Sequence, residues 1–175
     1  MPILPLSFYP DPILFTEAEP VTEFNQALRQ LIANMFDTMY AAPGVGLAAP
    51  QVGVSKRLFV MDCSSRQHDA KPLVVANPEI LFATGEQNDS EGCLSVPGYS
   101  SMLRRPMTVV LRGQDLDGNE FEYDATEVEA RCVLHETDHC DGILYLHQLS
   151  PVKRLEIVNS IKKKIKAQRW PHERN

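Results

Sequence analysis

The chain has 175 residues, of which 43% are apolar and 23% are charged, and its formal net charge is -6 at pH 7. A chain of this length buries about two thirds of its unfolded surface around one core, so we expect a single domain over residues 1–175. The composition excludes a disordered protein, and the negative charge argues against general nucleic-acid binding. No apolar stretch approaches the ~18 residues of a membrane span and no secretory signal opens the chain, so we expect a cytoplasmic protein.

The N-terminal part predicts an extended segment followed by a helix. Residues 1–15 contain four prolines in an apolar setting, which suits a segment laid over the body of the protein. Apolar residues then recur at helical spacing and predict an amphipathic helix over residues 23–41, which Pro43 ends. The apolar positions of this helix are Phe24, Leu28, Leu31, Ile32, Met35 and Met39.

A glycine-rich stretch, GVGLAAPQ at Gly44–Gln51, follows that helix. Glycines permit backbone shapes and close approaches that side chains forbid. On local sequence alone, a tight turn between two elements is the simplest interpretation.

Short runs of apolar and β-branched residues predict strands in the middle of the chain. Asn77-Pro78 marks a turn, Asp117-Gly118 is a hairpin signal, and His68 lies in a polar loop where solvent is its expected partner. Strands that precede a central and a final helix favour an α+β fold, with antiparallel sheets packed around the central helix. The runs are Arg57–Met61, Leu73–Ala76, Glu79–Thr84, Met107–Arg112 and Glu120–Tyr123.

The motif HETDH predicts a metal site on the central helix. His135 and His139 lie four residues apart, so both project from one face of a helix, with Glu136 beside the first. Thr126 and Glu129 have the spacing of a capping box, and Gly142 is the expected stop signal. This pattern is typical of a hydrolytic metal centre on a largely buried helix.

A catalytic site of this kind usually has three protein ligands and one open position. Cys93, in the polar segment EGCLS at Glu91–Ser95, is the favoured third ligand because a thiolate is a strong soft ligand. His147 is the alternative, but Tyr145 stands where the extended zincin motif requires histidine.

The other three cysteines lack the paired spacing of a disulfide or zinc framework. We expect Cys63 and Cys132 to be small buried hydrophobic residues. Cys140 follows a predicted ligand, but its side chain is turned by about 100° from that of His139 on the helix, so we do not expect it to bind the metal.

A last helix is predicted to begin at Ser150-Pro151, since proline suits the first helical turn. Its basic side, which includes Lys162 to Lys164, suits solvent, although contact with RNA phosphates is the sharper hypothesis. From Trp170 the tail is expected to fray. The expected apolar stripe is Val152, Leu155, Ile157, Val158, Ile161 and Ile165.

Three motifs in one order make the chain similar to a known family. GVGLAAPQ, EGCLS and HETDH, with YPDP at Tyr9–Pro12 and LSP at Leu149–Pro151, resemble the motifs of the peptide deformylases. The resemblance covers nearly the whole chain and implies one catalytic domain over residues 1–175. The implied activity is metal-dependent hydrolysis of the N-formyl group from the N-terminal methionine of newly synthesised polypeptides, with release of formate.

The resemblance also implies the cofactor and the roles of individual residues. One divalent ion would be held by Cys93, His135 and His139, with Fe(2+) as the physiological metal and Zn(2+), Ni(2+) or Co(2+) as substitutes. Glu136 would be the catalytic base, and Gln51 with the backbone amide of Leu94 would stabilise the oxyanion. Val45 and Gly46 would pair with the substrate backbone.

The partner implied by the resemblance is an N-formylmethionyl peptide, with ribosome contact through the C-terminal basic helix. No membrane and no sequence-specific nucleic acid is expected to bind.

Two other functions stay open at this point. The chain departs from common family usage at four positions, namely Leu134, Cys140, His147 and Ser100, so a catalytically impaired formyl-peptide binding protein is one alternative. A zincin-type peptidase with His147 as the third ligand is the other.

Overall fold

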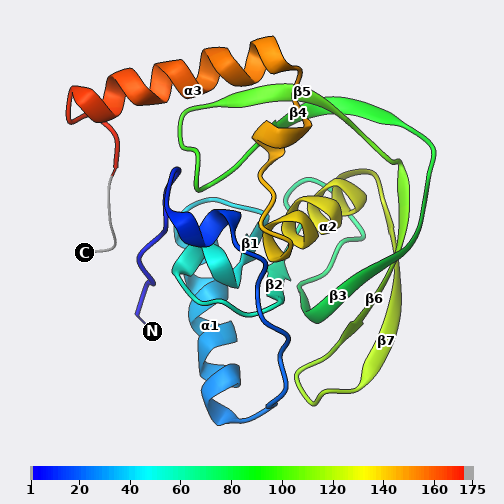
Figure 1. The fold of residues 1–175 in the computed structure, drawn as a ribbon. Coiled ribbons are helices and arrows are strands. Elements are labelled where there is room, and N and C mark those ends of the chain that lie inside the picture. Colours follow the sequence, from blue (N-terminus) through cyan, green and yellow to red (C-terminus); the bar gives the residue numbers. More distant parts are fainter. Residues whose placement is uncertain (1, 172–175) are drawn as a thin grey trace.

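The computed structural model describes residues 2–171, and it has the expected α+β architecture with antiparallel sheets (Figure 1). Three short 3-10 helices, η1 (Pro12–Phe15), η2 (Ala49–Val52) and η3 (Tyr145–Gln148), join the longer elements. Within residues 2–171 no helix is both long and apolar enough to cross a lipid bilayer. The other elements are α1 (Gln26–Ala41), β1 (Gly46–Ala48), β2 (Leu58–Met61), β3 (Leu73–Thr84), β4 (Gln87–Gly92), β5 (Ser100–Arg105), β6 (Thr108–Gln114), β7 (Glu120–Thr126), α2 (Glu127–Cys140) and α3 (Pro151–Lys166).

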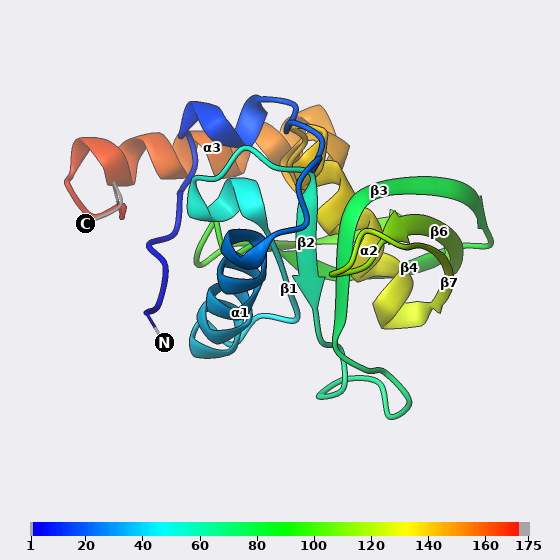
Figure 2. The ribbon, with the colours of Figure 1, turned by 90° about the horizontal axis from the view of Figure 1, so that it is seen from below.

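The larger sheet has the strand order β1-β2-β3-β6-β7, and each neighbouring pair is antiparallel. Successive side chains of a strand point to opposite faces, and both faces of β2 are buried. Phe59 and Met61 pack in the core with Val133 of α2, whereas Leu58 and Val60 pack with α1. Figure 2 shows α1 and α2 on opposite sides of β1 and β2. The predicted central helix is therefore confirmed, because α2 packs against a strand that is buried on both faces.

The second sheet is the hairpin of β4 and β5, which α3 accompanies in Figure 1. On α3, Ile161 is fully buried, but Val152 and Leu155 are 67% and 58% exposed. The predicted apolar stripe is wrong for this first part of the helix, because nothing in the described fold covers it there. Trp170 is buried and its Nε1 donates to the backbone oxygen of Tyr9 at 2.6 Å, so fraying from Trp170 is also wrong. Residues 172–175 lie outside the described part.

The turn predicted at Asn77-Pro78 is wrong, since β3 continues through it. Asn77 has a φ of 53°, and the pairing of β3 with β6 shifts register between Ala76 and Glu79. Asparagine tolerates this left-handed backbone better than most residues. Its side chain also accepts a hydrogen bond from the Val21 backbone at 2.8 Å, so the feature is a β-bulge and the strand does not end.

Helix α2 begins differently from the expectation and ends as predicted. The Thr126 side chain makes no capping hydrogen bond, and Glu127 enters the helix with a φ of 54°. The expected capping box is absent because the Glu129 carboxylate accepts the Tyr123 hydroxyl at 2.6 Å instead. At the other end Gly142 adopts a φ of 73°, which confirms it as the stop signal.

Candidate metal centre

The two histidines of HETDH face the same point. Both project from α2, both are buried, and their Nε2 atoms lie 3.2 Å apart. Two nitrogen ligands at about 2.0–2.1 Å from one tetrahedral ion are separated by about 3.3–3.4 Å. The observed separation is therefore close to that of two ligands on one ion.

Cys93 joins this pair from the segment that follows β4. Its Sγ lies 3.3 Å from His139 Nε2, and the ligand atoms of Cys93, His135 and His139 all lie within 4.8 Å of one another. A thiolate with two imidazoles is a donor set that suits zinc or ferrous iron. The three residues expected to bind the metal thus form one cluster, and their chemistry fits a divalent cation.

Burial and neighbouring charges act differently on the two rings. Burial lowers the pKa of His139 well below its ordinary value, which keeps that ring neutral and its nitrogen lone pair available. Burial would also lower the pKa of His135, but hydrogen bonds with Cys93 and Glu91 outweigh it and raise the pKa well above the ordinary value. A divalent cation held by His135 would take the place of the proton on Nε2, since metal binding requires the deprotonated ligand.

Glu91 orients one of the predicted ligands. It is buried on β4, and its Oε2 accepts the Nδ1 proton of His135 at 2.9 Å, which directs Nε2 toward Cys93 and His139. Burial alone would raise the pKa of Glu91, but hydrogen bonds from His135 and Arg105 outweigh it and hold the pKa far below its usual range. Glu91 is thus ionised, and a carboxylate–histidine pair supports the cluster.

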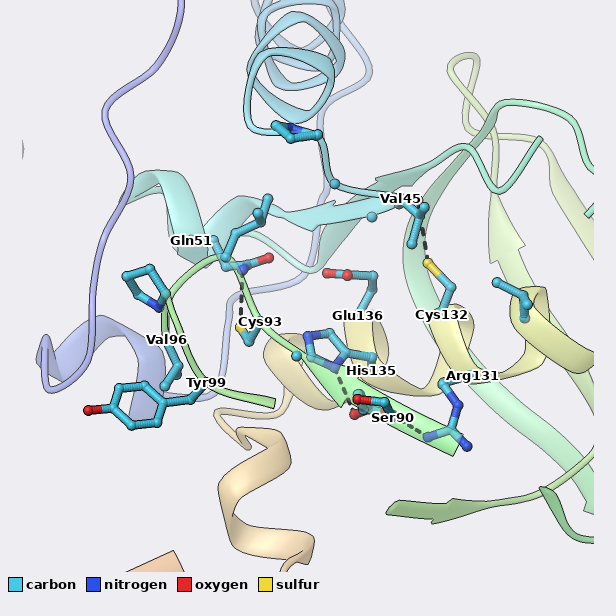
Figure 3. Close-up of a pocket in the computed structure, with 18 of the residues that line it drawn as sticks. Val45, Gln51, Ser90, Cys93, Val96, Tyr99, Arg131, Cys132, His135 and Glu136 are labelled. Carbon is cyan, nitrogen blue, oxygen red and sulfur yellow. Dashed lines mark hydrogen bonds and ion pairs between the residues drawn. The ribbon is translucent and has the colours of Figure 1, made fainter. Parts of the chain in front are cut away.

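Glu136 lies beside the cluster, between α2 and β1 (Figure 3). It is buried, its Oε2 has no hydrogen-bond partner among the described residues, and burial raises its pKa to about 7. Gly46 of β1 packs directly against it, because a Cβ on Gly46 would lie 2.5 Å from Glu136 Oε1 and 2.7 Å from Cys132 Sγ. Only glycine allows this close approach, which a tight turn alone does not require.

The Gln51 side chain is held in one orientation. Its Oε1 accepts the backbone amide of Ala48 at 2.9 Å, and its Nε2 donates to Ser95 Oγ at 3.2 Å and to Cys93 Sγ at 3.5 Å. The amide group is buried, so its two ends cannot exchange without breaking these bonds. A fixed N–H donor therefore stands next to the proposed ligand sulfur.

A cleft of about 390 Å³ opens onto this cluster. Strand β1 is an edge strand of the larger sheet and borders the cleft, so the side not paired with β2 is available to an extended ligand. Figure 3 shows the side chains of the cleft between β1 and α2. The lining residues include Gly44, Val45, Gly46, Gln51, Glu91, Gly92, Cys93, Leu94, Tyr99, Val128, Arg131, Cys132, His135 and Glu136.

The rival ligands lie elsewhere. The Nδ1 of His147 accepts the backbone amide of Leu144 at 2.9 Å, and His147 is not part of the Cys93 cluster. Cys140 is fully buried and also outside the cluster, while Cys63 and Cys132 are buried core residues as expected. His68 is exposed, as predicted. Among the described residues, the cluster that could hold a metal ion is therefore the predicted set of Cys93, His135 and His139.

Several residues that support the site were not predicted. Arg105, Arg131 and Ser95 hold Glu91 and Gln51, yet none of them stands at a spacing that indicates this role. What marks these residues is that they are buried polar side chains, and burial cannot be seen in the sequence.

Comparison with known proteins supports one family. The family model for polypeptide deformylase matches residues 3–155. A protein from Acidobacterium capsulatum named peptide deformylase is 46% identical over 97% of this chain and 100% of its own length. One from Thermodesulfovibrio yellowstonii with the same name is 49% identical over 88% of this chain and 93% of its own.

Solved structures of peptide deformylases have a similar fold. A peptide deformylase from Legionella pneumophila superposes with a TM-score of 0.87 at 42% identity, covering 97% of this chain and 100% of that one. A peptide deformylase from Ehrlichia chaffeensis in complex with actinonin has a TM-score of 0.87 at 38% identity, covering 94% of this chain and 98% of that one.

Proposed function

The chain belongs to the polypeptide deformylase family, and on that premise we propose which of its residues carry out the reaction. It is a hydrolase that removes the N-formyl group from the N-terminal methionine of newly synthesised polypeptides and releases formate. The resemblance seen in the three motifs is confirmed, and the peptidase and impaired-binder alternatives are not favoured. Residues 1–175 would form a single catalytic domain.

Cys93 Sγ, His135 Nε2 and His139 Nε2 would hold the metal, because they meet at one point with the right donor chemistry. Fe(2+) would be the ion used in the cell, with Zn(2+), Ni(2+) or Co(2+) as substitutes, since thiolate and imidazole bind all four. When bound, such an ion lowers the pKa of water toward ~7 and polarises a carbonyl group.

The substrate would lie along β1 as an added strand. Val45 and Gly46 would pair with its backbone, because β1 is an edge strand that borders the cleft. The peptide's formyl end would then lie near Glu136, against which Gly46 packs. Strand addition uses hydrogen bonds to the peptide backbone, so it would place the formyl group whatever side chains the peptide carries.

Glu136 would transfer the proton. Its Oε2, which has no hydrogen-bond partner among the described residues, would take a proton from the attacking water and deliver it to the leaving amine. With a pKa raised by burial to about 7, the carboxyl group can both accept and donate a proton near neutral pH. A bound cation would lower that pKa, which favours the carboxylate form needed for the first transfer.

Gln51 and Leu94 would stabilise the negative charge that forms on the formyl oxygen. The Gln51 Nε2 is buried and oriented by its bond to Ser95 Oγ at 3.2 Å, and its other N–H, which donates to Cys93 Sγ at 3.5 Å, would be given to the oxyanion instead. The backbone amide of Leu94, the residue after Cys93, would be the second donor. A single donor of this kind lowers the barrier by about 3 kcal/mol.

The convergence of the Cys93, His135 and His139 ligand atoms beside buried Glu136 carries this proposal. The test is turnover of formyl-Met-Ala-Ser by the purified protein, followed as formate release, with metal content measured on the same sample. Formate release that depends on the metal supports the proposal. Binding of the peptide without turnover at full metal occupancy would instead support the impaired-binder alternative.

The ribosome is a further proposed partner, and the cytoplasm is the proposed location. The basic residues of α3 would contact ribosomal RNA phosphates, since Lys162, Lys163 and Lys166 are exposed on the described helix. A cytoplasmic location would follow from the substrate, because newly synthesised chains emerge there. Ribosome binding that persists after these three lysines are changed to glutamine would contradict the proposed contact with ribosomal RNA.

A further inference from the structure

Arg131 is a buried arginine in the wall of the cleft, one helical turn before His135. Its NH1 donates to Glu91 Oε1 at 3.0 Å, and its NH2 donates to the backbone oxygen of Leu103 at 2.9 Å. Figure 3 shows its side chain running beside His135 toward β4. Arg131 therefore joins α2 to both strands of the β4–β5 hairpin.

This connection matters because the proposed ligands come from the same two parts of the fold. His135 and His139 stand on α2, whereas Cys93 follows β4 directly. Glu91 lies two residues before Cys93 and accepts the Nδ1 proton of His135. A residue that fixes Glu91 thus fixes the orientation of one ligand and the start of the segment that carries another.

Two carboxylates and two arginines meet in this buried cluster, beside the His135 ring. Glu91 and Asp138 are the carboxylates, and Arg105 pairs with both of them at 2.8 Å. Arg131 supplies the second positive charge through its pair with Glu91 at 3.0 Å. Because Arg105 is shared between two carboxylates, Arg131 is the arginine in this cluster whose charge serves Glu91 alone.

We propose that Arg131 is a positioning residue for the metal centre, acting through Glu91 to hold His135 in its ligand orientation. This inference rests on the proposed ligand set of Cys93, His135 and His139. The planar guanidinium fork of Arg131 is essential to the role, since its two fixed N–H directions reach β4 and β5 at once. A lysine keeps the charge but offers a single flexible ammonium in place of the fork.

The experiment compares the whole protein with its Arg131→Lys variant, using Co(2+) as the probe. The apparent dissociation constant is measured by competition with a chelator, and the visible spectrum reports the ligand geometry around the ion. Partners that orient metal ligands typically change affinity by about 10–100-fold when removed. We expect Arg131→Lys to bind Co(2+) more weakly within that range and with an altered spectrum.

Arg57→Lys is the matched control. Arg57 also ties the end of α2 to a strand, since NH1 donates to the Cys140 backbone oxygen at 3.3 Å and to Asp141 at 2.6 Å, and NH2 donates to the Pro78 oxygen of β3 at 2.9 Å. It does not touch Glu91, so its variant should keep the wild-type Co(2+) affinity and spectrum. An equal loss of Co(2+) affinity in both variants would overturn the proposal, because it would mean that any change that loosens α2 weakens metal binding.

A second variant covers the case in which Arg131→Lys does not fold. Arg131→Met fills the same space with an uncharged stem. Loss of a positive charge alone favours a nearby cation, so weaker Co(2+) binding in this variant would point to a displaced Glu91. Wild-type affinity and spectrum in whichever of the two variants folds would overturn the proposal.

The Glu91→Gln background tests the route. If Arg131 acts through Glu91, then Arg131→Lys should have little further effect on Co(2+) affinity there, and a full effect would overturn that route. If the proposed ligand set itself is wrong, the wild-type protein will not bind one Co(2+) per chain. That result differs from a failure of the Arg131 proposal, in which the wild-type protein still binds the ion.

Discussion

The sulfur of Cys93 lies 3.3 Å from Nε2 of His139, although the two residues are 46 positions apart in the sequence. Cys93 directly follows β4 and His139 stands on α2, and these elements are connected by the Glu91–Arg131 ion pair and by Arg105, which pairs with Glu91 of β4 and Asp138 of α2. The proposed metal site is therefore a contact between a hairpin and a helix. Its properties depend on the residues that hold these elements together as much as on the ligands.

Replacing Glu136 by glutamine should remove catalysis and leave the metal bound. Glutamine has nearly the same shape but cannot accept the proton, and general-base catalysis contributes about 10²–10⁴-fold. The measurement is formate release from formyl-Met-Ala-Ser together with metal content. Asp141→Asn, a change at an exposed carboxylate beyond the end of α2, is the control. Retained turnover in Glu136→Gln would rule out its role as the base.

Replacing Cys93 by serine should release the metal, because the hard alcohol oxygen is a much weaker ligand than a thiolate. Metal content after dialysis against a chelator measures this. Cys140→Ser changes a buried cysteine next to a ligand but outside the cluster, so it should keep its metal. If Cys93→Ser kept both metal and activity, the site would require another third ligand.

Replacing Gly46 by alanine should lower turnover by roughly 10²-fold. The new methyl group would lie 2.5 Å from the present position of Glu136 Oε1, so the carboxylate would have to move away from it. Gly44→Ala is the matched control. Its Cβ would meet the end of the flexible Leu94 side chain at 2.8 Å, so we expect a much smaller loss. Equal losses in the two variants would contradict a specific contact between Gly46 and Glu136.

On α3, Ile161→Ala should cost about 2–5 kcal/mol in the free energy of unfolding, whereas Leu155→Ala should stay within about 0.5 kcal/mol. The reason is burial, since Ile161 is fully buried and Leu155 is 58% exposed. Urea unfolding of both variants measures the difference. A large destabilisation by Leu155→Ala would show that another surface covers this residue in solution.

Much of the fold could be predicted because local patterns carry it. The helical spacing of apolar residues located α1 to within a few residues, and Asp117-Gly118 located the β6–β7 hairpin. The errors came where a distant partner overrode the local signal. Asn77 was predicted to be in a turn, but its side chain bonds to Val21 and Gln114, which stabilise a bulge inside a continuous strand.

For the site, the sequence by itself determined that His135 and His139 share a helix face, because a spacing of four residues is close to one helical turn. It also indicated the chemical types of the proposed ligands and of the proposed base. Only the tertiary structure decided that Cys93 reaches them, that Arg131 and Arg105 hold Glu91, and that Gly46 touches Glu136. The physical reason is that periodicity relates residues within one element, whereas contacts between elements depend on how their buried faces pack.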